Sequence, residues 1–276
     1  MKTVEMVVNN ETYIIVNVLD KSKKKISKVK EYIKLLSKQL DENIKGFIIL
    51  SNSDTALVKI EIINRDGSLG YLSANGILCA AKYLHEKKYT GSTSFDIETS
   101  HGNRNVSFDL KNNEIKNLNI NLGNGSTNPK KIPMFCEKNI FINEEILVDN
   151  KKYCVTAVSV GNSHLVSFVD NIKNIDIQEL GPKMECYYLF PERVNVEFAE
   201  ILNEKNIRAK IWERGRGKAK SCGTASAAIV YAGIVSGKLA LEDEYIIHTN
   251  AEIQRVSIDS DKNLHIVNSY HKVYKK

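Results

Sequence analysis

The chain alternates apolar and polar residues over many short segments, at the spacing of half-buried β-strands. These segments are rich in Ile, Val, Thr and Tyr, and turn residues such as Asp66-Gly67 separate them. The predicted strands are 12–20, 46–53, 56–64, 94–100, 105–110, 115–122, 153–160, 164–170, 208–215, 245–250, 253–259 and 264–270. Amphipathic helices are predicted at about 25–42 and 196–206, where apolar residues follow the helical period.

Two further segments, 73–84 and 222–233, combine helical spacing with an unusual number of small residues. Each begins with a small polar residue, Ser73 or Cys222, that can cap a helix. Small side chains let the surrounding strands approach closely, as a helix enclosed by a sheet requires. The two segments therefore predict two copies of one structural unit.

This duplication predicts the fold class. We expect an α+β protein of two pseudo-symmetric halves, each a barrel-like mixed sheet around a central helix. The predicted N-terminal half is 1–122, completed by a C-terminal strand at 265–276, and the predicted C-terminal half is 123–264.

Composition and charge narrow the class of protein. The 276 residues are 42% hydrophobic and 26% charged, which is typical of a folded globular protein. The net charge of +6 comes from lysine runs such as 21–30, which we interpret as solvated surface because no interleaved aromatic residues or nucleic-acid-binding module accompany them. The N-terminus lacks the apolar core of a signal peptide, and no run approaches the ~20 apolar residues that span a bilayer. We therefore predict a cytoplasmic protein that binds neither nucleic acid nor membrane.

The five cysteines, at 79, 136, 154, 186 and 222, include no CxxC pair and no Cys/His cluster at metal-ligand spacing. In a reducing cytoplasm they stay free thiols, and no metal site is predicted. Cys79 falls within the body of a predicted helix and is expected in the core. Of the five, only Cys222 has a chemical context.

Several motifs, found in order between about residues 60 and 240, resemble those of the diaminopimelate epimerase family. They are Asn64-Arg65-Asp66-Gly67-Ser68 with Ala74-Asn75-Gly76 and Cys79, then Gly161-Asn162-Ser163-His164, Phe190-Pro191 with Asn195-Val196, Trp212-Glu213-Arg214-Gly215, and Ser221-Cys222-Gly223-Thr224. Each motif alone is weak evidence, but their shared order argues against chance.

The resemblance implies two pseudo-symmetric halves with the active site between them, no cofactor, and a homodimer. In that family two cysteines flank the α-carbon of an amino acid; one removes a proton and the other supplies one from the opposite face. The implied function is an isomerase, an epimerase or racemase acting on diaminopimelate or a similar amino acid with a charged distal end. Such an activity belongs to lysine biosynthesis.

Cys222 is the candidate thiol acid/base. A free cysteine has a pKa of ~8.5, and a helix N-terminus favours the thiolate, so we expect a lowered pKa for Cys222. The backbone amides of Asn75, Gly76, Gly223 and Thr224 are candidates to bind the α-carboxylate. Outside this motif, a cysteine at such a position would more often be a small buried residue.

The resemblance places the distal substrate contacts on Asn64, Asn162, Asn195, Glu213 and Arg214. Arginine offers a planar fork for a carboxylate, and glutamate accepts from an ammonium group. The alternative is that the asparagines are turn residues and the charged pair lies on the surface at a strand end.

His164 and Glu11 are candidate orienting residues. His164 either orients a catalytic group or is an ordinary hydrogen-bonded histidine. Glu11 lies in Asn10-Glu11-Thr12-Tyr13, where the family has a GNDF motif that this chain lacks. Its charge would favour a cationic group near the distal end of the substrate.

Ser73 stands where the family has its first cysteine, and a hydroxyl is a far poorer base than a thiol. Three explanations are compatible with this serine. It is an engineered replacement of a cysteine; or the enzyme is a Ser/Cys epimerase, as among proline racemase-like relatives, in which Ser73 relays a proton through water; or the reaction uses one base and does not invert the centre.

Two other functions therefore remain open beside epimerisation. One is a one-base isomerase, tautomerase or dehydratase on the same scaffold. The other is a non-catalytic protein that binds an amino acid in a retained pocket.

Overall fold

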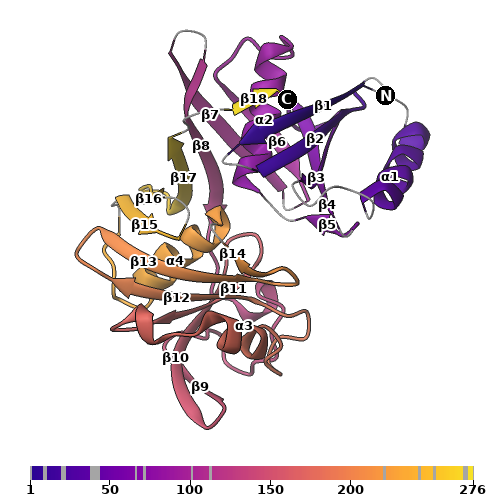
Figure 1. Ribbon diagram of the computed structural model, residues 1–276. Coiled ribbons are helices and arrows are strands. Elements are labelled where there is room, and N and C mark those ends of the chain that lie inside the picture. The colour runs from indigo at the N-terminus through magenta and orange to yellow at the C-terminus, as the bar shows by residue number, and fades with distance from the viewer. Residues whose placement is uncertain are drawn as a thin grey trace. The chain divides into compact units, whose positions relative to one another are not determined.

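The computed structural model describes residues 2–8, 11–19, 23–37, 44–65, 67–70, 73–100, 102–111, 114–219, 222–241, 244–250, 253–269 and 273–275 (Figure 1). The chain forms two compact units. Unit 1 is 1–121 with 268–276, and unit 2 is 122–267.

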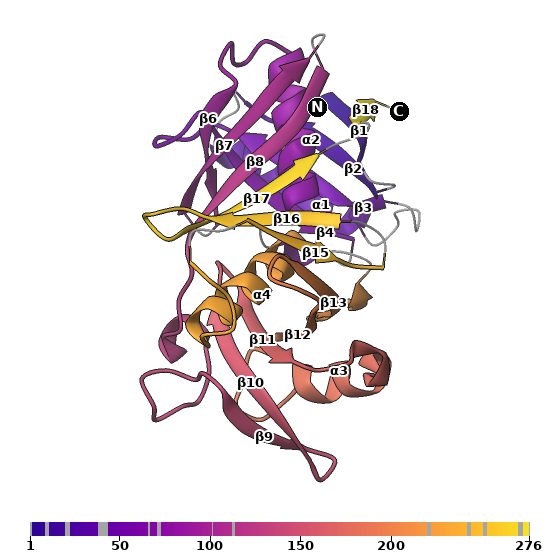
Figure 2. The same ribbon diagram turned by 90° about the vertical axis from the view of Figure 1, so that its left-hand side faces the viewer.

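Unit 1 holds a mixed sheet and two helices. Its strands are β1 (Lys2–Val8), β2 (Glu11–Asn17), β3 (Ile44–Ser51), β4 (Val58–Asn64), β5 (Leu69–Gly70), β6 (Ser94–Thr99), β7 (Gly102–Lys111), β8 (Glu114–Asn124) and β18 (Val273–Lys275), and its helices are α1 (Lys23–Ser37) and α2 (Ala74–Glu86). The strands pair in the order β18-β1-β2-β3-β4-β6-β7-β8, with β5 folded back on β4. The pairs β2/β3 and β4/β6 are parallel, and the others are antiparallel. Figure 2 shows β7 and β8 side by side as a long hairpin.

The two helices of unit 1 pack against different sets of sheet residues. Ile33 of α1 is buried in a cluster with Phe47, Ile49 and Ile63, whereas α2 packs against β1 to β4. Successive strand residues point to opposite faces, so alternate apolar residues of β2, β3 and β4 serve α1 and α2 in turn. These strands are accordingly apolar on both faces.

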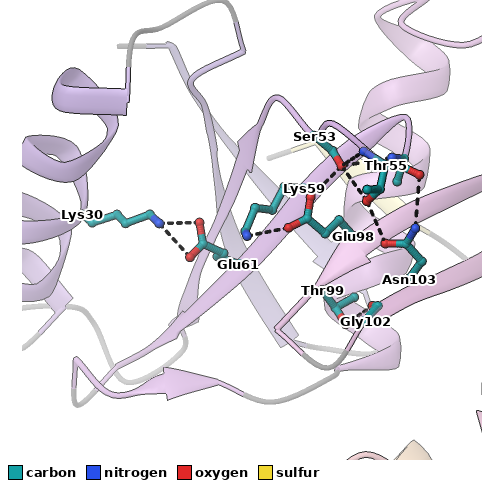
Figure 3. Close-up of polar contacts among 10 residues, drawn as sticks. Lys30, Ser53, Thr55, Lys59, Glu61, Glu98, Thr99, Gly102 and Asn103 are labelled. Carbon is teal, nitrogen blue, oxygen red and sulfur yellow. Dashed lines mark hydrogen bonds and ion pairs between the residues drawn. The ribbon is translucent and has the colours of Figure 1, made fainter.

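On the face of β4 that packs against α1, residues that form ion pairs follow the apolar residues (Figure 3). Lys30 of α1 donates to Glu61 at 2.7 Å, and Lys59 donates to Glu98 at 2.6 Å. Lys59 and Glu98 are register partners on the parallel pair β4/β6. These contacts tie α1 to β4 and β4 to β6 at partly exposed positions, where ion pairs add little stability and mainly fix geometry.

Unit 2 repeats this plan. Its elements are the 3₁₀ turns 129–131 and 172–174, strands β9 (Glu144–Val148), β10 (Lys151–Ser159), β11 (Ser163–Phe168), β12 (Asn195–Ile201), β13 (Asn206–Glu213), β14 (Gly217–Ala219), β15 (Glu244–His248), β16 (Ile253–Ile258) and β17 (Asn263–Ser269), and helices α3 (Ile177–Glu185) and α4 (Gly223–Val235). The strands pair in the order β9-β10-β11-β12-β13-β15-β16-β17, with β14 folded back on β13. The parallel pairs are β11/β12 and β13/β15.

The strand registers show that the two units are copies. In unit 1 the paired residues Ile14, Phe47 and Ile63 cross β2, β3 and β4. In unit 2 the residues Leu165, Val196 and Trp212 cross β11, β12 and β13 in the same parallel and antiparallel sense. A short strand and then a small-residue helix follow in both units. The predicted pseudo-symmetric α+β fold is confirmed.

Helix α4 is enclosed on nearly every side. Its residues from Gly223 to Val230 are all buried, and it packs against β10, β11, β12 and β16. Alanine, glycine and serine side chains keep the helix narrow, which allows strands to approach it closely. Among the described residues, the pairings leave the sheet of each unit open rather than closed into a barrel.

One predicted helix is wrong and another was missed. Residues 23–37 form α1, close to the predicted 25–42, of which 38–42 lie outside the described residues. The predicted helix at 196–206 is instead strand β12 and the start of β13, because Val196, Glu197 and Phe198 are buried on both faces between β11 and β13. Helix α3 was not predicted. No helix within the described residues has both the length and the apolar character needed to cross a membrane.

We predict that Ile33→Ala lowers the free energy of unfolding by about 2–5 kcal/mol, because it removes a fully buried side chain from the cluster between α1 and the sheet. The matched control is Leu35→Ala on the same helix, whose side chain is 67% exposed and whose loss should change stability by less than about 0.5 kcal/mol. Urea titration followed by circular dichroism measures both. Equal losses in the two variants would contradict the packing described for α1.

Candidate active site

Ser73 caps the N-terminus of α2, as predicted. Its backbone is extended (φ −121°, ψ 116°), and its Oγ accepts a hydrogen bond from the Gly76 N–H at 3.1 Å. Its carbonyl oxygen accepts from Ile77 N at 2.9 Å and so opens the helical ladder. The Gly76 amide, predicted to bind a carboxylate, is therefore engaged by Ser73 in this structure.

A chain of hydrogen bonds leads from Ser73 to a carboxylate. The Ser73 Oγ lies 3.1 Å from the phenol oxygen of Tyr13, and that phenol donates to Glu11 Oε2 at 3.2 Å. The same carboxylate oxygen accepts from Asn75 Nδ2 at 3.0 Å, and Lys45 Nζ lies 2.9 Å from the other oxygen. Glu11 thus joins the start of β2 to the start of α2, and its charge is already paired within unit 1.

Asn64 ends β4 and closes the turn to β5. Its Nδ2 donates to Ser68 Oγ at 3.0 Å, and its backbone N–H donates to the Ser68 carbonyl at 2.8 Å. Asp66 of the same motif lies outside the described residues. A side chain at Gly70 would approach Asn64 Oδ1 to 3.0 Å and the Ile62 side chain to 2.7 Å, so glycine is required for this close return of the chain.

Cys222 occupies the N-cap position of α4, with an extended backbone (φ −157°, ψ 120°). Its Sγ lies 3.3 Å from the Thr224 hydroxyl. Burial of the sulfur and the negative charge of Glu213 raise the pKa of the Cys222 thiol, although the Thr224 hydroxyl and the Ala225 amide act in the opposite direction. The lowered pKa expected from the sequence is therefore wrong, since the amides at the helix start do not compensate for burial and nearby carboxylates. The resting group is a thiol.

A second polar chain runs through the interior of unit 2. His164 Nε2 lies 2.9 Å from Asn162 Oδ1, and His164 Nδ1 lies 2.7 Å from Glu197 Oε1. Both His164 and Glu197 are fully buried. Burial raises the pKa of the Glu197 carboxyl, while His164 acts in the opposite direction. These contacts fix the orientation of the imidazole.

Asn195 and Arg214 are joined through the backbone. The Asn195 side chain donates to the Ser163 carbonyl at 2.9 Å and accepts from the Arg214 N–H at 2.9 Å. The Arg214 guanidinium donates to the Glu192 carbonyl at 2.8 Å, and Glu213 lies 3.6 Å from Arg216. Asn195 thus holds the turn after β13 against the start of β11.

A buried carboxylate also holds this turn. Glu185, at the end of α3, accepts from the Trp212 indole N–H at 2.6 Å and from the Gly215 N–H at 2.9 Å. The indole lies directly against α3, where a side chain at Gly181 would come within 2.4 Å of it. Glu185 therefore holds the chain on both sides of Glu213 and Arg214, through Trp212 and Gly215.

The structure brings some of the predicted site residues together within each unit. In unit 1, Ser73, Asn75, Gly76 and Glu11 form one cluster. In unit 2 there are three contacts: Cys222 with Thr224, Asn162 with His164, and Asn195 with Arg214. The roles assigned to these residues stay predictions.

Three residues of these clusters were missed in the sequence: Tyr13, Lys45 and Glu197. Period-two alternation along β2 puts Glu11 and Tyr13 on one face, which is a signal for the first. Glu197 is a single charged residue between Val196 and Phe198. Because we interpreted that segment as an amphipathic helix, we did not expect Glu197 to be buried. Nothing in the pattern singled out Lys45.

All five cysteines are free thiols. Cys79 is buried in α2, as predicted, and burial together with the charge of Glu11 raises the pKa of its thiol. Cys154 and Cys186 are exposed.

Solved structures share this fold at low sequence identity. A hydroxyproline epimerase from Agrobacterium vitis superposes with a TM-score of 0.68 and 12% identity, over 99% of this chain and 90% of that chain. A phenazine biosynthesis protein of the PhzF family from Bacillus anthracis gives a TM-score of 0.62 and 16% identity, over 100% and 99% of the two chains. These similarities establish the fold alone.

Comparison with sequence relatives identifies the family as well as the fold. Residues 156–273 match the family model described as diaminopimelate epimerase. Diaminopimelate epimerase from Bacillus thuringiensis is 41% identical over 204 residues, which cover 74% of this chain and 71% of that protein, and the Bacillus mycoides enzyme is 40% identical over the same shares. The class is thereby defined as an isomerase of the epimerase and racemase type. The chain belongs to the diaminopimelate epimerase family.

We predict that Glu213→Gln lowers the pKa of the Cys222 thiol, because it removes a negative charge that disfavours the thiolate. The rate of alkylation by iodoacetamide at Cys222, followed by peptide mass spectrometry, should then rise at a lower pH than in the wild type. The exposed Cys154 in the same sample is the internal control and should react unchanged. An unshifted profile at Cys222 would show that Glu213 does not act on the sulfur.

Proposed function

We propose that this enzyme inverts the α-carbon of diaminopimelate, or of a similar amino acid whose side chain ends in charged groups. The observation that carries the proposal is Cys222 at the N-cap of a buried helix, within the influence of the Glu213 charge, in a chain of this family. The names of the curated relatives make diaminopimelate the first substrate to test.

The chemistry requires the substrate carboxylate to be held while the α-hydrogen leaves. Removing that hydrogen leaves an electron pair that spreads into the carboxylate, so fixed donors at its oxygens stabilise the developing charge. Amide groups at helix N-termini are such donors, since they have no partner within the helix. We assign this role to Asn75, Gly223 and Thr224, and to Gly76 when Ser73 turns away.

Cys222 supplies a proton in this proposal. Burial and the charge of Glu213 keep it in the thiol form, which is the form that can donate. As the thiol gives up its proton to the α-carbon, the Thr224 hydroxyl and the Ala225 amide stabilise the sulfur's new charge. Ser73 serves the opposite face of the same carbon.

The distal end of the substrate is assigned to Asn64, Asn162, Glu213 and Arg214. Arg214 can hold a carboxylate through its planar fork, and Glu213 can accept from an ammonium group. Asn195 acts by fixing the position of the Arg214 backbone, because its amide is engaged at both ends. His164, held by Asn162 and Glu197, orients the Asn162 amide.

The proposed reaction is cofactor-independent, since it needs only proton transfer at one carbon. We assign it to the cytoplasm and to lysine biosynthesis, and we expect the chain to act as a homodimer. These assignments rest on the family and on the composition of the chain.

Ser73 favours one alternative function. A hydroxyl at this position fits a one-base isomerase, tautomerase or dehydratase, in which only one face of the carbon exchanges its proton. Loss of water or exchange with retention of configuration would identify that reaction.

We predict that Cys222→Ala lowers kcat/KM for inversion of diaminopimelate by about 10²–10⁴-fold, the usual contribution of a positioned acid or base. Ser73→Cys should instead raise the rate, because a thiol is a better acid/base than a hydroxyl. Chiral chromatography of the product measures both, and Cys154→Ala, which changes an exposed thiol, is the control. Normal inversion by Cys222→Ala would end the proposal.

A further inference from the structure

The proposed function requires Ser73 to accept a proton, and a serine hydroxyl needs an adjacent base to do so. In unit 1 such a base is present at hydrogen-bond distance. The Ser73 Oγ contacts the Tyr13 phenol at 3.1 Å, and the phenol donates to Glu11 at 3.2 Å. Tyr13 is only 5% exposed and the Glu11 side chain is 24% exposed, so this chain of contacts leads from a buried phenol to a partly exposed carboxylate.

The direction of these hydrogen bonds is set by their surroundings. The Ser73 oxygen already accepts from the Gly76 N–H, and the Tyr13 hydroxyl hydrogen is directed to Glu11. The Ser73 hydroxyl hydrogen can therefore be donated to the Tyr13 oxygen. Two O–H groups then point one way, from Ser73 toward the Glu11 carboxylate.

The internal repeat gives Tyr13 a counterpart. The register triplets Ile14–Phe47–Ile63 and Leu165–Val196–Trp212 are equivalent, and the residues that precede Ile14 and Leu165 are Tyr13 and His164. Each of these two side chains lies beside a carboxylate, Tyr13 with Glu11 and His164 with Glu197. Both units thus place a proton-carrying ring at the same position on the same strand.

We propose that Tyr13 and Glu11 form a proton relay that makes Ser73 the acid/base group of unit 1, an inference that rests on the proposed function. The α-hydrogen passes to Ser73 Oγ as the serine hydroxyl proton passes to the Tyr13 oxygen and the phenol proton passes to Glu11 Oε2. One C–H and two O–H bonds break, three O–H bonds form, and the electron pair stays on the substrate. Cys222 then donates its S–H proton to the opposite face and becomes a thiolate.

Lys45 and Asn75 complete the relay. Lys45 lies 2.9 Å from Glu11 Oε1, and Asn75 donates to the oxygen that receives the proton. Tyr13 and Glu11 act through Ser73, so they are positioning residues in this scheme and Ser73 is the catalytic one. A purely structural alternative is that the three side chains only anchor α2 to β2.

The test is Tyr13→Phe, which keeps the ring and its burial but removes the relayed proton. Deuterium uptake from heavy water is measured separately for each configuration at the α-carbon of diaminopimelate. We expect uptake from the configuration whose hydrogen faces Ser73 to fall at least about 10²-fold, with KM changed less than about two-fold. The other configuration should instead exchange its hydrogen with retention, because Cys222 removes and returns the proton while Ser73 cannot complete the inversion. Glu11→Gln should produce the same one-sided loss.

The matched control is Tyr83→Phe. Tyr83 is 4% exposed, lies on α2, and accepts a hydrogen bond from Asn17 of β2 at 3.1 Å, so it anchors the same helix to the same strand. It should leave both exchange rates unchanged. Equal loss at both faces in Tyr13→Phe, a rise in KM alone, or no change would overturn the relay. If Tyr13→Phe does not fold, the pair Ser73→Ala and Glu11→Gln replaces it, and adding the second change to the first should cause no further loss.

A second measurement separates failure of the relay from failure of the proposed function. If the wild-type protein exchanges no amino acid, the proposed function fails, and the relay is then tested on the thiol introduced by Ser73→Cys. Tyr13→Phe in that background should raise the pKa of this thiol, because it removes a donor to the thiolate. The pH dependence of iodoacetamide alkylation reports it, and an unchanged pH dependence would overturn the relay.

Discussion

The unpaired amide groups at the start of a buried helix are the constraint on which each unit depends. Helices α2 and α4 lie against the strands of their own sheets, so their first N–H groups need polar partners. In α2 the partner is Ser73, whose oxygen accepts from Gly76. In α4 the N-cap is Cys222, whose side chain makes no capping hydrogen bond of the kind that Ser73 makes to Gly76. The chemistry proposed for this family member follows from that difference.

Local patterns in the sequence predicted the two small-residue helices, their starting residues and the duplication, because capping and helical spacing act within a dozen residues. The helix predicted at 196–206 was wrong because this segment pairs with strands distant in sequence. Val-Glu-Phe fits a helix by spacing but is buried on both faces of β12. The contact between Tyr13 and Ser73 joins residues 60 positions apart, so local sequence spacing could not predict it. We expected a lowered pKa for Cys222, whereas burial raises it, and the sequence motif does not reveal how deeply its sulfur is buried.

The two units share one scaffold and place different polar groups on it. In unit 1 Ser73 contacts Tyr13, which donates to Glu11; in unit 2 His164 occupies the register position equivalent to Tyr13 and contacts Glu197 on β12. In both units the ring lies beside a carboxylate, but Glu11 is on the same strand as Tyr13 whereas Glu197 is on the strand next to that of His164. The strand position of the ring is therefore shared by the two units, and the strand position of the carboxylate is not.

In the proposed reaction two different groups, one on each face, handle the proton at a single carbon. The most direct test follows wild-type enzyme and one stereoisomer of diaminopimelate in heavy water, and measures deuterium in product and in recovered substrate early in the reaction. Two groups acting from opposite faces predict deuterium at the inverted centre of the product and almost none in the recovered substrate. Deuterium that enters recovered substrate as fast as product forms would contradict the account, because one group would then both remove and return the proton.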